Sequence, residues 1–267
     1  MTATSWLAHA GNAALGRRYP FVLCYHGVGS VGAGADPEKI FLSTELFEHH
    51  LEVIAGQGYE LLSVGELWRQ MRSDVGAAGK GSITFDDGLT RTTRHAIPLL
   101  LERGIGCSLF VPTGLLGKTH PDAPSESIAT AQEIKELAAA GVEIGAHSVD
   151  HVDLARMSYA QALDQMRRSR EMLEDLLGKP VTTMAYPFGS ASADTVRAAR
   201  EAGYELACAC SGPGEWLPWM LPREPVYATS SPVRLRLKMA GLYGPVHALG
   251  GARRTLRRRV GRAESSR

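Results

Sequence analysis

Ser82-Ile-Thr-Phe-Asp-Asp-Gly-Leu-Thr90 is the stretch around which this chain is organised. A short apolar run of strand length ends abruptly in two carboxylates, Asp86 and Asp87, and a glycine. Asp-Gly is a common turn signal, and an aspartate in that position can cap the following helix. Two adjacent acids also repel each other, so unless both are solvated a divalent metal or a shared proton must offset their charge. The segment alone leaves both interpretations open.

Strands and helices alternate in the sequence on both sides of this segment. Apolar runs predict strands at 21–25, 59–62, 82–85, 106–111, 142–146, 182–186 and 204–210. Helical spacing and capping residues predict helices at 43–56, 63–72, 89–104, 130–140, 158–177 and 192–202, with a kink or a later start at Pro98. Such alternation predicts a parallel sheet with helices outside, as a barrel or a doubly wound sheet. Neither a GxGxxG after the first strand nor a phosphate-loop motif occurs, so dinucleotide and phosphate-loop chemistry are not indicated.

The composition supports a folded chain with a nearly even balance of charge. With 267 residues and 44% hydrophobic content, the chain can hold one large α/β domain or two small ones around a proper core. A formal net charge of +1 gives no global attraction to nucleic acid, so no nucleic-acid partner is expected. The four cysteines lie in apolar runs without metal-finger spacing, which is typical of buried thiols in a reducing compartment.

The two ends of the sequence bear on location. The first 20 residues lack the apolar core of a signal peptide, and no run of about 18 apolar residues occurs in the chain. We therefore expect a cytoplasmic protein, or one held at the inner face of a membrane. The sequence from Leu249 is dense in arginine. A frayed, solvated terminus is expected there, and contact with anionic lipid or a polyanionic polymer is the alternative.

Polar side chains follow several predicted strands, where the catalytic groups of α/β folds collect. His147 and His151 are spaced i and i+4, so both imidazoles can reach one ion from a single turn or a tight loop. Asp87 is the obvious third ligand, since two imidazoles and one carboxylate with an open position form a catalytic zinc site. Asp86 then stays free to move protons, because successive side chains at a strand end point in different directions. A lone histidine at a strand end is more often structural, so this prediction depends on the whole set.

Three motifs in this chain resemble, in order and spacing, the first three motifs of the polysaccharide deacetylase family (NodB homology, carbohydrate esterase family four). They are Thr84-Phe-Asp-Asp-Gly88, His147-Ser-Val-Asp-His151 and Tyr186-Pro-Phe-Gly189, and the resemblance spans about residues 21–227. It implies a single α/β domain folded as a distorted (β/α)7-type barrel, and a metal-dependent hydrolase that removes acetyl groups from N-acetylated sugars. The Tyr25-His26 start resembles the branch of the family that acts on exopolysaccharides.

The resemblance also implies a role for each matched residue. Asp86 is the general base, and a metal-bound water that loses its proton to Asp86 attacks the acetamide carbonyl. The backbone N–H of Phe188 stabilises the oxyanion, and Tyr186 and Pro187 of the same motif are assigned to substrate binding. Zinc is the expected metal, with Co²⁺, Ni²⁺ or Mn²⁺ as alternatives, and its ligands are Asp87, His147 and His151.

Two positions depart from the family pattern. The third motif usually begins with an arginine that orients the base, but Ala185 occupies that position here. Arg223, in Leu-Pro-Arg-Glu-Pro, could supply the guanidinium from a later strand, and an ordinary ion pair is the alternative. No convincing late Leu-x-His brings a catalytic acid, which leaves His26 as the better candidate and His247 as the second.

Several other aromatic and polar residues are ambiguous. Trp216 and Trp219 lie in a loop after the last predicted strand, where their faces could stack on a sugar, and core or interface packing fits equally well. Asp150 and Asp153 flank the second histidine and could support it from outside. The remaining histidines lack a partner pattern and are expected to be structural or solvated: His49, His50, His95 and His120.

These expectations divide the chain into an N-terminal extension at 1–20, a catalytic domain at 21–230 and a basic C-terminal extension at 231–267. The expected function is removal of N-acetyl groups from a glycan or glycoconjugate, with an acetylated sugar or polysaccharide as the binding partner. Two alternatives stay open. One is the same site acting on a non-sugar amide or an O-acetyl ester, and the other is a non-catalytic carbohydrate-binding relative.

Overall fold

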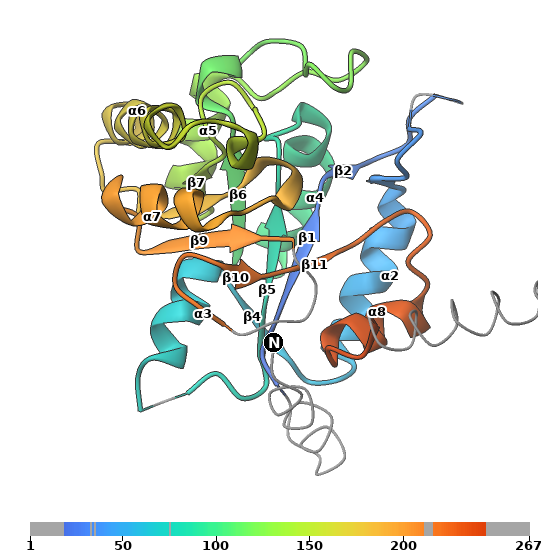
Figure 1. Ribbon diagram of the computed structural model, residues 1–267. Coiled ribbons are helices and arrows are strands. Elements are labelled where there is room, and N and C mark those ends of the chain that lie inside the picture. The colour runs from blue at the N-terminus through green and yellow to red at the C-terminus, as the bar shows by residue number, and fades with distance from the viewer. Residues whose placement is uncertain (1–18, 33, 35, 75, 211–215, 244–267) are drawn as a thin grey trace, which may run out of the picture.

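In the computed structural model, nine strands form one sheet in which every pairing is parallel (Figure 1). Their order is β10-β9-β8-β7-β6-β5-β1-β11, and β4 pairs with the first half of β5. The structure describes residues 19–32, 34, 36–74, 76–210 and 216–243, so His247 and the arginine-rich sequence from 249 lie outside the described residues. The strands are β1 Phe21–Tyr25, β4 Glu60–Leu62, β5 Lys80–Phe85, β6 Cys107–Val111, β7 Glu143–Ala146, β8 Thr183–Ala185, β9 Leu206–Ala209, β10 Leu221–Pro222 and β11 Glu224–Pro225.

The sheet closes on itself through a single residue. β10 pairs with β9 at one end of the strand order, β11 pairs with β1 at the other, and only Arg223 separates β10 from β11 in the chain. The order therefore gives seven positions around a barrel, with β10 and β11 sharing the seventh and β4 added beside β5. The predicted (β/α)7-type barrel is confirmed. A separate small sheet, formed by β2 Gly27–Val28 and β3 Phe41–Leu42, follows β1.

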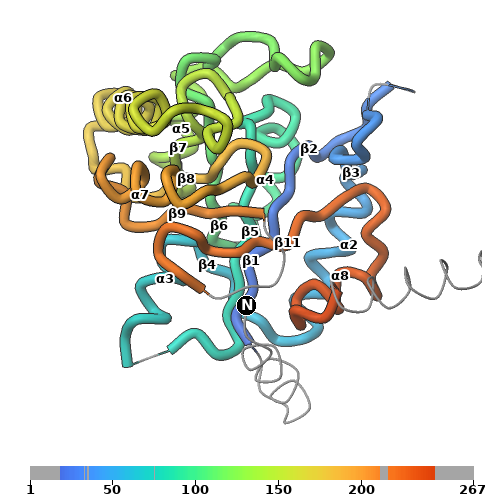
Figure 2. The backbone as a smooth tube through the Cα atoms, in the orientation of Figure 1, coloured from blue at the N-terminus to red at the C-terminus, as the bar shows by residue number. Residues whose placement is uncertain are grey.

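Seven helices surround the barrel in the described part of the chain (Figure 2). They are α2 Thr44–Ala55, α3 Val64–Met71, α4 Thr90–Glu102, α5 Ala131–Ala139, α6 Tyr159–Leu177, α7 Ala193–Glu201 and α8 Pro232–Met239. Thr130 and Ser158 form the capping boxes that the sequence predicts. The later start predicted at Pro98 is wrong, because α4 begins at Thr90 and contains the proline. Within these helices, none is long and apolar enough to cross a membrane.

The helix α8 lies beyond the predicted domain boundary at residue 230. Its Leu235 and Met239 are buried in the main apolar cluster, and Figure 1 shows α8 beside α2. A sequence-based boundary at 230 misses this helix because Arg234, Arg236 and Lys238 alternate with its apolar residues, which is not the spacing of a buried helix face. The division of the chain stays a prediction, but the packed core continues at least to α8.

The strands present alternate side chains to the helices and to the barrel interior. On β5, Ile83 and Phe85 belong to the large apolar cluster under the helices, whereas Thr84 points inside. A smaller cluster joins interior side chains to α3, and its fully buried members include Val22, Phe110, Leu206, Val64 and Leu67.

The helix α3 closes the amino end of the barrel. The Val64 N–H donates to Ser108 Oγ (2.8 Å) near the start of β6, and the Gly65 N–H donates to Glu143 Oε2 (3.0 Å) at the start of β7. Ser108 Oγ donates to the same carboxylate at 2.6 Å. Because α3 covers this end, the opposite end, where the strands terminate, is the open end of the barrel in the described part of the chain.

Candidate metal centre and active site

The chain turns sharply directly after β5, and this turn separates the two adjacent aspartates. Asp87 has φ 68° and Gly88 has φ 63°, so two consecutive residues adopt the left-handed conformation. A non-glycine residue there costs about 1–2 kcal/mol. A Cβ on Gly88 would lie 2.8 Å from Val111 Cγ1, so glycine is also required for space. As a result Asp86 faces the barrel interior and Asp87 faces the histidines that follow β7.

Three predicted metal ligands lie together at this end of the barrel. Asp87 Oδ1 is 3.5 Å from His147 Nε2 and 3.1 Å from His151 Nε2, and all three side chains are buried. Ligand atoms held about 2.0–2.2 Å from one tetrahedral ion lie roughly 3.4 Å from each other. The observed separations match that value, and one atom from each residue falls in a group no wider than 4.8 Å. The donor set and its spacing therefore fit a divalent ion.

Contacts on the far side of each ring bear on how the two imidazoles can act as ligands. His147 Nδ1 lies 2.9 Å from the carbonyl oxygen of Ala185, which can only accept, so Nδ1 carries the proton. His151 Nδ1 lies 3.3 Å from a carboxylate oxygen of Asp122 without a hydrogen bond between them. The His147 ring therefore keeps an unprotonated Nε2 facing Asp87, and a proton on Nδ1 of His151 would give that ring the same tautomer, as metal binding requires.

The acidic and histidine side chains of this cluster shift one another's pKa values toward the charged forms. Burial by itself raises the pKa of Asp87, but contacts with His120, His147 and His151 outweigh burial and hold this pKa well below its usual value. Burial lowers the pKa of His151, and the Asp87 carboxylate outweighs that effect and raises it. The carboxylate is thus charged and ready to bind a cation.

The loop that carries the two histidines is fixed by α6. Ser148 and His151 have φ values of 63° and 53°, which is strained backbone for non-glycine residues. Gln165 Oε1 accepts the N–H groups of Val149 and Asp150, and Gln165 Nε2 donates to Asp150 Oδ2 at 2.6 Å. Sequence analysis missed Gln165, whose only signal is a polar residue on the buried face of a helix. Asp150 therefore supports the loop, not His151 directly.

Asp86 is paired with a buried arginine. Arg223 Nη1 and Nη2 each lie 2.7 Å from one carboxylate oxygen, and Nη1 also donates to Thr84 Oγ1 (3.0 Å). Arg223 is fully buried at the seam between β10 and β11. Burial raises the pKa of Asp86, and the guanidinium outweighs burial and lowers it to about 2. The Arg223 guanidinium thus reaches Asp86 from the seam between β10 and β11, and its role in place of the missing motif arginine stays a prediction.

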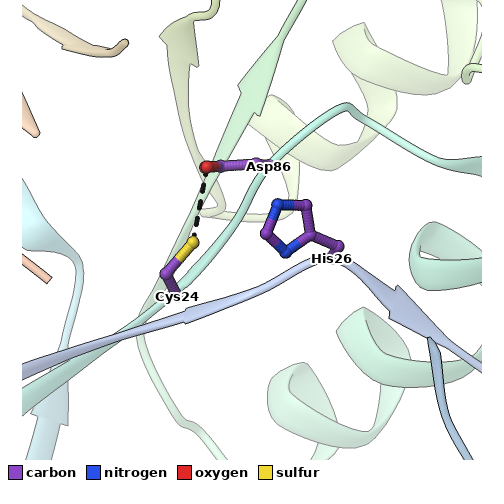
Figure 3. Close-up of side chains that lie close together, drawn as sticks. All are labelled: Cys24, His26 and Asp86. Carbon is purple, nitrogen blue, oxygen red and sulfur yellow. Dashed lines mark hydrogen bonds between the residues drawn. The ribbon is translucent and has the colours of Figure 1, made fainter. Parts of the chain in front are cut away.

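His26 lies next to this pair. Figure 3 shows its ring beside Asp86 and Cys24, and one ligand atom from each of the three residues falls within 4.8 Å. Cys24 Sγ donates to Asp86 Oδ2 at 3.4 Å, and both carboxylate oxygens already bind Arg223, so this trio is poorly suited to a metal. His26 Nδ1 is buried and has no hydrogen-bond partner in the described structure. The ring is half-buried beside Asp86, and its role as the catalytic acid stays a prediction.

The third motif contributes backbone and one exposed ring to the site. Phe188 has φ 59° in the turn Pro187–Gly189, its side chain is 60% exposed, and its ring centroid is 5.0 Å from that of His151. Tyr186 is fully buried and its hydroxyl donates to the Trp219 carbonyl oxygen (2.8 Å). The Tyr186 side chain therefore belongs to the core, whereas the Phe188 ring is open to a ligand.

The two tryptophans proposed to stack on a sugar have packing contacts instead. Trp219 Nε1 donates to the carbonyl oxygen of Tyr204 (2.8 Å), two residues before β9 begins, and the Arg200 guanidinium lies 5.3 Å from its ring centroid. Trp216 packs against the smaller apolar cluster beside α3. The contacts described for the two indole rings are with Tyr204, Arg200 and apolar core residues, and not with the metal-site residues. Of the two alternatives left by the sequence, these contacts favour core packing.

The predicted structural histidines divide into two kinds. His50 is buried, with Nδ1 3.2 Å from Tyr25 Oη and Nε2 2.7 Å from the Ser230 carbonyl oxygen, so its role is structural. His120 is also buried, but its Nε2 lies 3.7 Å from Asp87 Oδ2. His120 and its neighbour Asp122 therefore border the metal site. No pattern in the polar segment 118–127 predicts this position.

The barrel and its site place the chain in a class of α/β barrels with acidic and histidine side chains gathered where the strands end. A family model described as polysaccharide deacetylase matches residues 77–207. YxkH of Bacillus subtilis (strain 168), whose name places it among the polysaccharide deacetylases, is 27% identical over 186 residues, which is 69% of this chain and 62% of that protein. A chitin deacetylase of Pestalotiopsis sp is 29% identical over 125 residues, 47% of this chain and 39% of that protein.

Solved structures show the same fold. The deacetylase PplD of Streptococcus pyogenes, in complex with acetate, has a TM-score of 0.72 at 24% identity, covering 82% of this chain and 97% of that one. IcaB of Ammonifex degensii has a TM-score of 0.71 at 24% identity, with coverage of 83% and 97%. The chain belongs to the polysaccharide deacetylase family. The matches to the two curated relatives span less than two thirds of the length of those proteins.

Proposed function

We propose that this protein is a metal-dependent de-N-acetylase of a glycan or glycoconjugate. The observation that carries the proposal is the placement of Asp87, His147 and His151 as a ready ligand set beside the buried Asp86–Arg223 pair. Family membership supports the deacetylase chemistry, and the acetate in the PplD structure is the product that such chemistry releases.

The three ligand residues would hold a divalent ion. Zinc is the metal proposed, because two imidazole nitrogens and one carboxylate oxygen, with a coordination position left open for water, suit it. When bound, the ion supplies Lewis acidity that polarises the acetamide carbonyl and makes a water more acidic. Co²⁺, Ni²⁺ and Mn²⁺ accept the same donors and are the alternatives.

Asp86 and His26 divide the proton transfers. Arg223 keeps the Asp86 carboxylate charged, so this group can accept the proton of the attacking water. His26, next to Asp86, donates a proton to the nitrogen of the leaving amine as the C–N bond breaks. The net reaction consumes one water and yields acetate and a free amine. The Phe188 N–H is the proposed donor to the oxyanion, and the exposed Phe188 ring the proposed contact for the sugar.

The substrate is proposed to be an exopolysaccharide or a related N-acetylated glycan. The Tyr25-His26 start and the position of the His26 ring beside Asp86 favour this branch. A cytoplasmic location at the inner face of a membrane, with the arginine-rich sequence from Leu249 in contact with anionic lipid, is also a proposal. Flotation with anionic and neutral liposomes, comparing the full chain with one ending at Leu249, tests that contact.

The test is acetate release from a panel of acetylated compounds, with and without a chelator. N-acetylglucosamine oligomers should release acetate, and a chelator should abolish the release until zinc is restored. Asp86→Asn should lose at least about 100-fold in rate, whereas the exposed Asp164→Asn on α6 should match the parent. Release only from O-acetyl esters or small amides would favour the second enzyme hypothesis, and sugar binding without any release would favour the non-catalytic one.

A further inference from the structure

The segment 117–129, between the turn that follows β6 and helix α5, is anchored on both sides of the residues it presents. An antiparallel bridge joins Thr119 to Ser127, and the His120 N–H donates to the Glu126 carbonyl oxygen (2.9 Å). The Glu126 side chain is 4% exposed and binds Arg91 of α4 at 2.9 Å. The segment is therefore held by an ion pair whose carboxylate is buried, and by the backbone contacts on both sides of His120.

The hydrogen bond on one side of the His120 ring decides its tautomer. The Asp122 N–H donates to His120 Nδ1 (3.1 Å), so Nδ1 has no proton and the neutral ring carries its proton on Nε2. That Nε2 is buried, has no hydrogen-bond partner in the described structure, and lies 3.7 Å from Asp87 Oδ2. A buried N–H needs an acceptor, and Asp87 Oδ2 is the carboxylate oxygen that the structure places beside this nitrogen.

His120 thus has the opposite tautomer to the one that metal binding requires of the two ligand histidines. His147 bears its proton on Nδ1 and turns an unprotonated Nε2 toward Asp87 Oδ1, and His151 needs the same tautomer to bind a metal through the Nε2 that faces Asp87 Oδ1. His120 turns an N–H toward the other oxygen, Oδ2. A protonated ring nitrogen cannot bind a metal, so His120 is suited to donate to the ligand and not to replace it.

Asp122 has a matching contact two residues further on. Its Oδ2 lies 3.3 Å from His151 Nδ1, the nitrogen that must keep its proton for His151 to bind a metal through Nε2. The His120 and His151 rings also meet edge to face, with centroids 4.9 Å apart. One short segment therefore reaches two of the three ligands.

We propose that His120 and Asp122 are positioning residues of the metal centre. His120 Nε2–H holds Asp87 Oδ2, so that Oδ1 alone is presented to the ion, and Asp122 holds His151 in its ligand tautomer. A hydrogen bond between the two groups would require His120 Nε2 and Asp87 Oδ2 to approach more closely than the present 3.7 Å. This inference rests on the proposed metal site and adds a segment that the family motifs do not include.

Metal affinity of the full-length protein tests the proposal. Zinc binding is measured by competition with a chromophoric chelator, for the parent, His120→Ala, His120→Gln and the exposed control His49→Ala. Loss of a residue that supports a metal ligand weakens metal binding by about 10–100-fold. We expect His120→Ala to show that loss, His120→Gln to recover most of the affinity through its N–H donor, and His49→Ala to match the parent. Asp122→Ala should weaken binding less, because its side chain is 58% exposed.

The cobalt spectrum separates a positioning role from direct ligation. At saturating Co²⁺, His120→Ala should keep the visible bands of the parent, because the three ligands are unchanged. Equal zinc affinity in His120→Ala and the parent overturns the inference while leaving the metal site intact. A changed cobalt spectrum that His120→Gln does not restore overturns it in favour of direct ligation. A parent protein that binds no metal overturns the proposed function and the inference together. Unfolding temperatures of the metal-free variants identify any general loss of structure.

Discussion

Replacement of Arg223 by methionine should show how much the Arg223–Asp86 pair at the barrel seam contributes to the stability of the fold. The guanidinium is fully buried, and it binds both oxygens of Asp86 and the Thr84 hydroxyl. Methionine has a similar length and fills most of the same space without charge. The substitution therefore leaves a carboxylate that is only 3% exposed without its counter-ion.

The expected loss of stability in Arg223→Met follows from the charge of Asp86. Burial raises the pKa of this group, and Arg223 outweighs burial and lowers the pKa from 3.8 to about 2. That difference corresponds to roughly 2.4 kcal/mol in favour of the charged carboxylate. Without the guanidinium the cost of burial is no longer offset, so the loss should exceed this value. Removing one partner of a buried pair costs about 3–5 kcal/mol, and we expect a loss in that range.

Urea unfolding of the chelator-treated protein near neutral pH measures this loss. Asp86→Asn/Arg223→Met should be more stable than Arg223→Met, because the unpaired buried charge is gone. Arg69→Met is the control, since Arg69 is 68% exposed in its pair with Glu66, and its loss should be below about 1 kcal/mol.

The pH dependence has a defined sign. The pKa of Asp86 is lower in the folded state, so its stabilisation is complete above the unfolded value of 3.8 and is lost as the pH falls through about 2. The difference in free energy of unfolding between the parent and Arg223→Met should therefore decrease as the pH is lowered. The reasoning would be refuted if the free energy of unfolding of Arg223→Met lay within about 1 kcal/mol of the parent value. It would also be refuted if Asp86→Asn/Arg223→Met were no more stable than Arg223→Met.

Three further substitutions separate packing from function. Gly65→Ala should lower the free energy of unfolding by about 1–3 kcal/mol, because its Cβ would lie 2.2 Å from Glu143 Oε1, whereas Gly32→Ala, with nothing within 4 Å, should have little effect in the same urea titration. Phe188→Ala should raise KM for the glycan several-fold and change stability by less than about 1 kcal/mol, since the ring is 60% exposed; an unchanged KM would remove the ring from substrate binding. Trp219→Ala should do the reverse, with a loss of about 2 kcal/mol from its packed indole and an unchanged KM.

The barrel could be predicted from sequence because its strands are continuous apolar runs with clear helices between them. β1 was predicted with its observed bounds, and most other elements differ by one or two residues at each end. The closing strands β10 and β11 could not be predicted, since each has two residues and two prolines lie among them. Such short strands exist only because β9 and β1 are already in place to pair with them.

The metal-site candidates were accessible from sequence because they follow β5 and β7 within a few residues. The strand direction alone brings Asp87 and the two histidines to one end of the barrel. His120 was not accessible, because its place depends on the fold of an irregular segment and on the Arg91–Glu126 ion pair. The tryptophans show the opposite case. An aromatic pair in a loop is typical of a sugar-stacking surface, but the hydrogen bond of Trp219 to the Tyr204 carbonyl oxygen favours a packing role.

The central claim is that the cluster of Asp87, His147 and His151 holds the ion that the deacetylation needs. The most direct measurement is acetate release from an N-acetylglucosamine oligomer as zinc is titrated into the stripped, full-length protein. We expect release to begin from zero and rise linearly until one equivalent is bound, and His147→Ala to abolish the rise. Full release by the stripped protein, or by His147→Ala, would contradict the claim.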